Sequence, residues 1–145
     1  ENADGGDVLV TPHTVFIGLS QRTNAAGADA LAAHLRALGR QARAVATPAG
    51  ILHLKTACAL LAQDTILATA AMAASGIFSG FRLVITPDGE EGAANALRLH
   101  DVVLVSDAWP RTIELLMREG FEVRALPLRE IAKLDAGLSC MSLRW

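Results

Sequence analysis

Hydrophobic and polar positions follow a pattern that occurs three times along the chain: two short apolar runs, an amphipathic segment and a third apolar run. In its first occurrence, residues 7–10, 15–17 and 42–46 are typical of β-strands. The amphipathic segment predicts a helix from apolar residues at helical spacing: Ala28, Leu31, Ala32, Leu35 and Leu38. Thr23 or Asn24 can cap the first turn of this helix.

The second and third occurrences repeat this order with other residues. The second predicts strands at 57–62, 65–70 and 81–85, with a weaker helix near 72–78. The third predicts strands at 94–99, 102–106 and 122–126, with a helix that begins at Pro110 and ends at Gly120. A short helix at 128–134 and a turn at 135–137 are predicted before the final segment, 141–145.

Three strand–strand–helix–strand units, about 45–50 residues apart, are typical of an α/β fold built by radial or stacked repetition. The length of 145 residues corresponds to one domain or a large piece of one. We therefore expect a single domain, 1–145, with repeats at about 7–47, 55–86 and 93–127 and a closing segment at 128–145.

Composition and charge exclude several classes of protein. Thirteen Lys and Arg against fifteen Asp and Glu give a formal net charge of -2, which argues against nucleic-acid binding through a basic surface. A hydrophobic content of 52% is sufficient for a core and excludes a disordered chain. The sequence has no apolar run long enough to cross a membrane, and residues 1–4 do not resemble a signal peptide. We expect a cytoplasmic globular protein that contacts neither nucleic acid nor membrane.

Two cysteines, Cys58 and Cys140, lack the spacing of a zinc site, and the sequence predicts no metal or cofactor. Cys58 lies in an apolar run and is expected to be a small buried hydrophobe. Cys140 follows a glycine-containing turn, which could expose it. An exposed thiol in an electropositive site can become a nucleophilic thiolate, but burial is the commoner role of a single cysteine.

Three further residues are candidates for chemistry. His53 lies between two leucines at a predicted strand start, so it would face a cleft if those leucines face the core; a partly buried structural histidine is equally compatible. The other histidines, His13, His34 and His100, are expected at the surface. Asp4 lies in an Asp-Gly-Gly-Asp turn and could orient a catalytic histidine or be solvated. Arg22 could clamp a substrate carboxylate or be a surface charge.

Several motifs together resemble those of the dimethylarginine dimethylaminohydrolase family, in the same order along nearly the whole chain. They are Asp4-Gly-Gly-Asp7-Val-Leu, Phe16-Ile-Gly-x-Ser20-x-Arg22-Thr-Asn, Leu52-His53-Leu54-Lys55-Thr56, Ala93-Ala94-Asn95 and Ser139-Cys140-Met-Ser-Leu-Arg144. The resemblance implies the pentein fold, a five-bladed α/β-propeller of which this chain would supply about three blades. It also implies hydrolysis of a methylated arginine to citrulline and dimethylamine through a covalent cysteine intermediate.

The resemblance also implies a role for each matching residue. Cys140 would be the nucleophile, His53 the general acid and base, and Asp4 its carboxylate partner. Arg22 would bind the substrate carboxylate, and the Leu134 carbonyl would bind the amino-acid end of the substrate. The related arginine deiminases and amidinotransferases carry an aspartate two positions after the histidine, where this chain has Lys55.

The resemblance covers only the second half of the family's longer chains, so we expect an N-terminal half with the remaining blades and the acidic residues that hold the guanidinium. The alternative is a short homologue, but an incomplete propeller would expose strand edges. The resemblance leaves three alternatives open: an arginine deiminase, an amidinotransferase, or a binding module without catalysis. Apart from a small-molecule substrate, the expected partners are this half and, as one option, a second copy in a homodimer.

Overall fold

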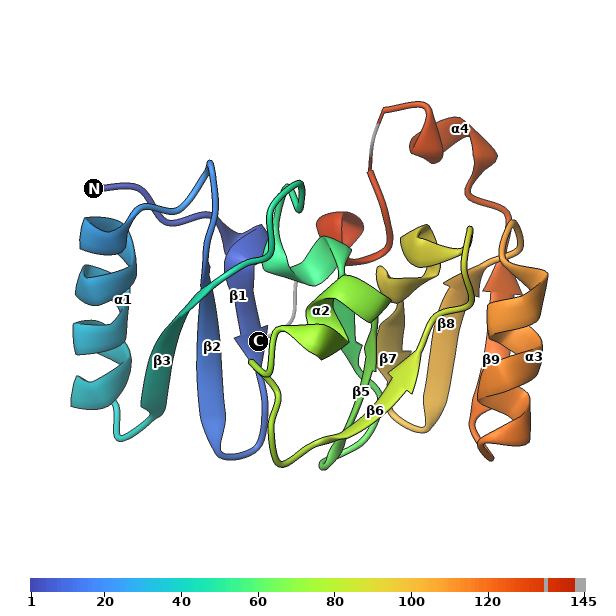
Figure 1. Cartoon of the computed structure of the whole chain (residues 1–145), viewed down its shortest axis with the longest axis horizontal. Helices are drawn as coiled ribbons and strands as arrows, with labels where there is room; N and C mark the ends of the chain where they lie inside the picture. The colour runs from blue at the N-terminus through green and yellow to red at the C-terminus, as the bar shows by residue number, and fades with distance from the viewer. Residues whose placement is uncertain (135, 143–145) are drawn as a thin grey trace.

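The computed structural model describes residues 1–134 and 136–142. Three three-stranded sheets follow one another along an arc, with helix α1 at one end and helix α3 at the other (Figure 1). The first contains β1 (Val8–Val10), β2 (Thr14–Leu19) and β3 (Gln41–Ala46); the second, β4 (Cys58–Leu60), β5 (Thr65–Ala68) and β6 (Arg82–Ile85); the third, β7 (Leu97–Leu99), β8 (Val102–Ser106) and β9 (Glu122–Leu126). The helices are α1 (Ala25–Ala37), α2 (Ala70–Ala74), α3 (Pro110–Arg118) and α4 (Arg129–Ala132). In the part of the chain that the structure describes, no helix could cross a membrane.

All three sheets have one topology. The first two strands form an antiparallel hairpin, and a helix then carries the chain across so that the third strand pairs in parallel with the second. A parallel partner requires such a crossover because the chain must return to the same end of the sheet. This confirms the α/β fold of ββαβ units predicted from the apolar pattern.

Local sequence fixes the helix ends. The Asn24 side chain accepts the N–H of Gly27 at 2.8 Å and caps α1, as predicted. Pro110 is the first residue of α3, where its missing N–H costs nothing. Gly39 and Gly120 follow the two helices with φ of 74° and 88°, a backbone conformation that favours glycine.

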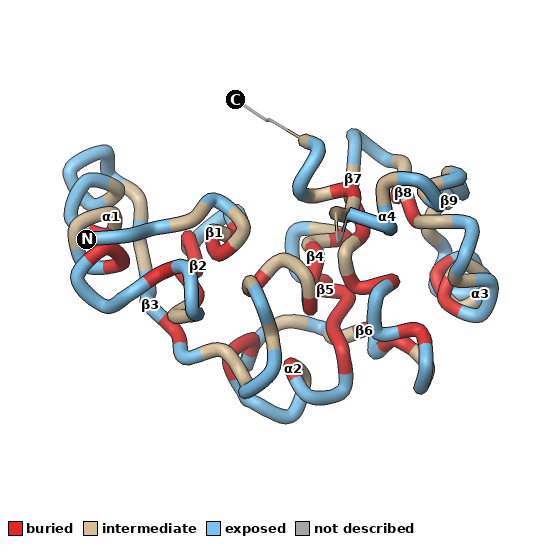
Figure 2. The backbone as a smooth tube through the Cα atoms, turned by 90° about the horizontal axis from the view of Figure 1, so that it is seen from above, coloured by how far each residue is buried: buried red, intermediate tan, exposed pale blue. Residues whose placement is uncertain are grey.

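The core lies between neighbouring sheets. Phe16 of β2 makes edge-to-face contacts with Phe78 and Phe81, with ring centroids 5.2 Å and 6.1 Å apart, which joins the first unit to the second. A second cluster joins units two and three through Leu67, Val103 and Leu116. Figure 2 shows the resulting bands of buried backbone along the arc.

A short 3₁₀ turn precedes the first strand of each sheet. These turns are η1 (Gly5–Asp7), η2 (Leu54–Thr56) and η3 (Glu91–Ala94), and a fourth turn, η4 (Ser139–Met141), follows the third unit. The chain reaches η2 and η3 through two loops of the form Thr-Pro-x-Gly, 47–50 and 86–89, in which Gly50 and Gly89 have φ of 83° and 81°. The repeated topology therefore places successive turns at the same end of neighbouring sheets.

Two predicted elements differ from the structure. The strand predicted at 94–99 is wrong at its start, because Ala93 and Asn95 donate their N–H groups to Glu90 and Gly92 within the turn; the strand begins at Leu97. The helix predicted near 72–78 is Ala70–Ala74, which Thr69 caps and Gly76, with φ of 72°, follows. The predicted turn at 135–137 and the final segment 141–145 lie partly outside the described residues.

Cys58 and Cys140 should differ sharply in reactivity. Cys58 is 1% exposed and donates from Sγ to the Leu54 carbonyl at 3.2 Å, and burial raises the pKa of its thiol, whereas Cys140 is exposed. We expect a disulfide-exchange reagent to label only Cys140 in the native protein and both thiols after denaturation, as counted by mass spectrometry. Cys140→Ser should then leave the native protein unlabelled. Rapid native labelling of Cys58 would contradict its burial.

Candidate active site

The first residues of the site come from equivalent positions of two units. Asp4 is the N-cap residue of η1 and His53 is the N-cap residue of η2. The two turns contact each other, and η2 also contacts β1 and β2 of the first unit. Residues 49 positions apart in sequence thus meet because each occupies the same place in its repeat.

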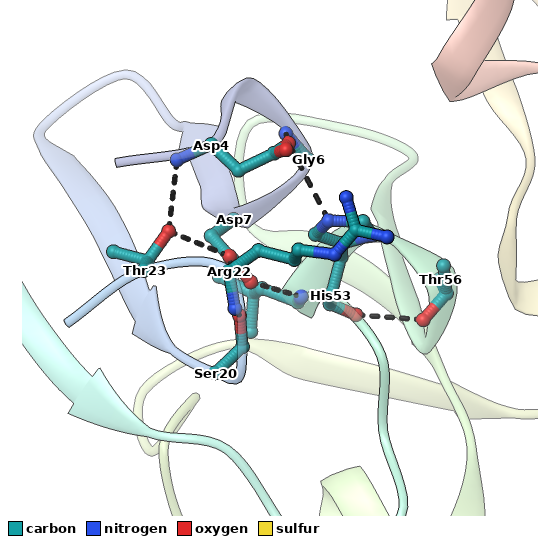
Figure 3. Close-up of polar contacts among 9 residues, drawn as sticks. Asp4, Gly6, Asp7, Ser20, Arg22, Thr23, His53 and Thr56 are labelled. Atoms are coloured by element: carbon teal, nitrogen blue, oxygen red, sulfur yellow. Dashed lines mark hydrogen bonds and ion pairs between the residues drawn. The ribbon is translucent and has the colours of Figure 1, made fainter. Parts of the chain in front are cut away.

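Asp4 and His53 form an ion pair at the centre of this arrangement (Figure 3). His53 Nε2 lies 3.5 Å from Asp4 Oδ1, and the side chains are 15% and 39% exposed. Nε2 is buried and makes no hydrogen bond within the described residues, and the Asp4 carboxylate is its ion-pair partner. The pair can therefore orient the imidazole and stabilise its protonated form.

The environment of Asp4 keeps its carboxyl ionised. The N–H of Gly6 donates to Oδ1 at 2.7 Å and is the main cause of a pKa below the ordinary value. Partial burial acts in the opposite direction, while the charges of His53 and Arg22 lower the pKa further. The Asp4 backbone N–H is held by Thr23 Oγ1 at 2.9 Å, which fixes the turn itself.

Gly6 also sets the position of the imidazole. A Cβ at Gly6 would lie 2.8 Å from His53 Cγ and 3.1 Å from Asp4 Oδ1, so the ring packs directly on the backbone of this residue. A Cβ at Gly5, in contrast, would meet nothing within 4 Å. The second glycine of the Asp-Gly-Gly-Asp turn is therefore required by close approach, and the first is not.

Arg22 lies beside the pair. Arg22 is exposed, and its side chain points toward His53 and the Asp4 carboxylate (Figure 3). Its backbone N–H donates to Ser20 Oγ at 3.0 Å, which holds the loop between β2 and α1. The arrangement places a cation next to an imidazole and a carboxylate at one end of the sheets.

The prediction of a strand start at His53 is wrong. Residues Leu54–Thr56 form a 3₁₀ turn, so side chains do not alternate across a sheet there. Leu52 is 42% exposed whereas Leu54 is 0% exposed, so the two leucines do not share one face. His53 approaches Asp4 through this turn, which Thr56 closes by donating its hydroxyl to the His53 carbonyl at 2.7 Å. His13, His34 and His100 are exposed, as predicted.

Cys140 lies in η4 and is exposed. The N–H of the preceding Ser139 donates to Asn95 Oδ1 at 3.0 Å, and a Cβ at Gly137 would lie 2.1 Å from Asn95 Nδ2. Asn95 caps η3, which contacts η2, so the cysteine turn rests on the unit next to that of His53. The hydrogen bonds and ion pairs of the described residues do not join Cys140 to His53, and the nucleophile role stays a prediction.

Leu134 follows α4 and is 80% exposed, with its N–H donating to the Ile131 carbonyl at 2.9 Å. The structure thus brings together Asp4, His53 and Arg22, whereas the contacts of Leu134 described here are local. Asn95 and the buried Asp7 lie in two of the sequence motifs, but an asparagine or aspartate in those motifs does not by itself indicate a role. Among residues 1–134 and 136–142, no group of three or more His, Cys, Asp or Glu side chains could hold a metal ion.

Comparisons with known proteins match the sequence and fold of this chain to related enzymes. Residues 1–90 match the family model described as arginine deiminase. A dimethylarginine dimethylaminohydrolase of Pseudomonas aeruginosa is 34% identical over 142 residues, which cover 98% of this chain and 56% of the relative. Another, of Streptomyces coelicolor, is 35% identical over 142 residues, with coverage of 97% and 54%.

Among solved structures, the Pseudomonas aeruginosa enzyme as a cysteine-to-serine mutant with citrulline aligns with a TM-score of 0.93 and 33% identity. The alignment covers 99% of this chain and 56% of that one. The chain therefore spans about half the length of the curated relatives it matches.

Gly6→Ala should displace the His53 ring without unfolding the protein. The added methyl group meets the imidazole, a side chain that can move, rather than the backbone. We expect the ¹H–¹³C resonances of the His53 imidazole to shift in this variant and to stay unchanged in Gly5→Ala, the matched control. Equal spectra for the two variants would be inconsistent with the close packing of Gly6 on the ring.

Asp4 should contribute to the acid sensitivity of the fold. Because its pKa is lowered on folding from the ordinary 3.8, the ionised form stabilises the folded state above that pH, and this contribution is lost as the pH falls below it. Asp4→Asn keeps an oxygen for the Gly6 N–H but removes the charge. The difference in unfolding free energy between wild type and variant should therefore shrink below about pH 4 in denaturant titrations. The exposed Asp107, changed to Asn, is the control.

Proposed function

The chain belongs to the arginine deiminase family, and from this premise we propose that it carries the catalytic cysteine, histidine and carboxylate of a dimethylarginine dimethylaminohydrolase. The reaction is hydrolysis of an Nω-methylated arginine to citrulline and dimethylamine. The observation that carries the proposal is the ion pair between His53 and Asp4, with Arg22 beside it. Nearly the whole of this chain aligns with part of such an enzyme.

Two further observations support this substrate. Two of the curated relatives are named dimethylarginine dimethylaminohydrolases, and one aligned solved structure is a complex with citrulline, the proposed product. Lys55 stands where the resemblance expects an aspartate in enzymes that act on an unmethylated guanidinium. A lysine has only donors and cannot accept the N–H groups of an unmethylated guanidinium nitrogen, whereas a dimethylated nitrogen has no N–H to bind, which favours a substrate that carries methyl groups.

In the first half of the proposed reaction, the Cys140 thiolate attacks the guanidinium carbon. His53 then gives its proton to the dimethylated nitrogen, the C–N bond breaks, and neutral dimethylamine leaves behind an S-alkylthiouronium on Cys140. Asp4 orients the imidazole and stabilises its protonated form until this transfer. The step needs protonated His53 because an amide anion is too poor a leaving group to depart without a proton.

In the second half, His53 takes a proton from water, and the resulting hydroxide adds to the thiouronium carbon. The added hydroxyl then loses its proton to solvent, where the released dimethylamine takes it up, and His53 keeps the proton from water for the next cycle. The C–S bond breaks, citrulline is released and the thiolate is regenerated. Arg22 would bind the substrate carboxylate through its planar guanidinium, and the Leu134 carbonyl would accept a hydrogen bond from the substrate ammonium. A guanidinium has a pKa above about 12, so it must be held as a cation while its carbon becomes tetrahedral.

We propose that residues 1–145 are the C-terminal part of a five-unit propeller whose first units supply the acidic residues that hold the guanidinium. The coverage of 56% and 54% of the relatives supports this arrangement. The complete protein would be cytoplasmic and act without a cofactor, and a homodimer is one form in which it could occur.

Arginine deiminase activity is the second candidate, since the matching family model carries that description. The leaving group separates the two candidates. The natural full-length protein should release dimethylamine from asymmetric dimethylarginine, quantified by chromatography, and little ammonia from arginine. Preferential release of ammonia from arginine would identify a deiminase. Transfer of the amidino group to an added amine would identify an amidinotransferase, and binding without turnover would identify a non-catalytic module.

His53→Gly tests the mechanism within the same assay. We expect steady-state turnover to fall roughly a hundredfold to ten-thousandfold, because general acid catalysis is lost. A substrate with a better leaving group, such as S-methylthiocitrulline, should still give a covalent adduct, seen by mass spectrometry as an increase on the peptide that contains Cys140. Cys140→Ser is the control and should give no adduct. Turnover of His53→Gly close to wild type would reject the role of this histidine.

A further inference from the structure

A buried carboxylate lies beneath the proposed site. Asp7, the last residue of η1, is 0% exposed and contacts the side chains of the loop between β2 and α1 and the backbone of η2 (Figure 3). Its Oδ2 accepts the hydroxyls of Ser20 and Thr23, each at 2.7 Å, and its Oδ1 accepts the backbone N–H of Leu54 at 2.9 Å. A buried carboxylate is stable only when such donors replace the water that it has lost.

Each group that donates to Asp7 either accepts a hydrogen bond from a proposed site residue or is its neighbour in sequence. Thr23 Oγ1 also accepts the N–H of Asp4, and Ser20 Oγ also accepts the N–H of Arg22. Leu54, the third donor, directly follows His53 and is itself fully buried. A single carboxylate therefore connects the backbone positions of Asp4, Arg22 and His53.

The direction of these hydrogen bonds depends on the charge of Asp7. A hydroxyl has one proton to donate, and a carboxylate is an acceptor only. Because Asp7 takes the protons of Ser20 and Thr23, the lone pairs of both hydroxyls are left for the N–H groups of Arg22 and Asp4. An amide at this position has a donor end and cannot satisfy all three partners in these directions.

The surrounding packing leaves little room for another arrangement. A Cβ at Gly18 of β2 would lie 3.2 Å from Asp7 Oδ1 and 2.9 Å from Leu54 Cβ. The carboxylate is thus enclosed between β2 and η2, and its partners cannot be replaced by water without moving one of these elements.

We propose that Asp7 is a positioning residue for the reaction: it fixes the positions of Asp4, His53 and Arg22 relative to one another. This proposal rests on the proposed function, since it assigns Asp7 a role through Asp4, His53 and Arg22. It differs from a purely structural role because the two hydroxyls act on different site residues and should affect different kinetic constants.

The experiment compares three variants of the natural full-length protein. Asp7→Asn keeps the side-chain volume but puts an NH2 donor where a carboxylate oxygen accepts hydrogen bonds. It should lower kcat about tenfold to a hundredfold, because a misplaced catalytic group slows a reaction by about this factor. Thr23→Val releases Asp4 and should lower kcat with little change in KM. Ser20→Ala releases the loop of Arg22 and should raise KM severalfold with little change in kcat. Kinetics are measured at a temperature where circular dichroism shows every variant to be folded.

Thr65→Val is the matched control for the loss of a buried threonine hydroxyl bonded to a carboxylate. Thr65 is 2% exposed and donates to Asp64 Oδ1 at 2.9 Å, and it begins β5 at the end of the sheet away from η2. This variant should lose stability while keeping kcat and KM. If Thr23→Val and Ser20→Ala change activity only as much as this control, or change kcat and KM alike, the positioning role is overturned.

A readout without turnover separates this proposal from the proposed function. The side-chain resonances of His53 and Arg22 should shift in Asp7→Asn and stay in place in Thr65→Val. If wild type turns over no guanidino substrate but these resonances shift, the proposed function fails, while the placement of the His53 and Arg22 side chains by Asp7 holds. Unshifted resonances overturn the positioning role whether or not the protein is active.

Discussion

The sheets in this chain have more apolar surface than their own helices cover, and burial of the remainder against a neighbouring unit organises the rest of the structure. In the first unit, α1 covers one face of the sheet, where Ile17 packs with Ala28 and Ala32, and a repeat of this kind cannot bury the other face alone. Phe16 of the first unit therefore packs on Phe78 and Phe81 of the second, and Leu67 of the second packs with Val103 and Leu116 of the third. The contacts fix the rotation between units, and with it the relative positions of the turns at the sheet ends.

The candidate site follows from that arrangement. Because every unit has the same topology, the turns that precede the first strands come to the same end of neighbouring sheets, and Asp4 and His53 occupy the same N-cap position in successive units. Glu90 is the corresponding residue of the third unit, but its carboxylate turns to α3, where it accepts the N–H and hydroxyl of Thr112, both at 2.7 Å. One structural position thus forms the His53–Asp4 ion pair in two units and binds the start of helix α3 in the third.

The sequence predicted the parts of this fold that depend on local patterns. Strands 102–106 and 122–126 and the cap at Asn24 were predictable because apolar alternation and capping need only neighbouring residues. The 3₁₀ turn at Leu54–Thr56 was not, because its short apolar segment resembles a strand and its conformation depends on the bond from Leu54 to Asp7, 47 residues away. For the same reason, the sequence pattern could identify His53 and Asp4 as candidate site residues but could not show that their side chains contact each other. It also did not indicate that Asp7 is buried.

The two carboxylates of the Asp-Gly-Gly-Asp turn have different surroundings, and the arrangement of the site needs both. They are three residues apart, and the Asp7 N–H closes the 3₁₀ turn by donating to the Asp4 carbonyl at 3.0 Å, while the two side chains contact different partners. The Asp4 side chain is 39% exposed and lies beside His53 and Arg22, an environment in which a carboxylate can orient an imidazole and still exchange contacts during a reaction. Asp7 has no exposure and only neutral donors, an environment that holds backbone in place. A single carboxylate could not do both, because the hydrogen bonds that anchor the segments would compete with the imidazole for its lone pairs.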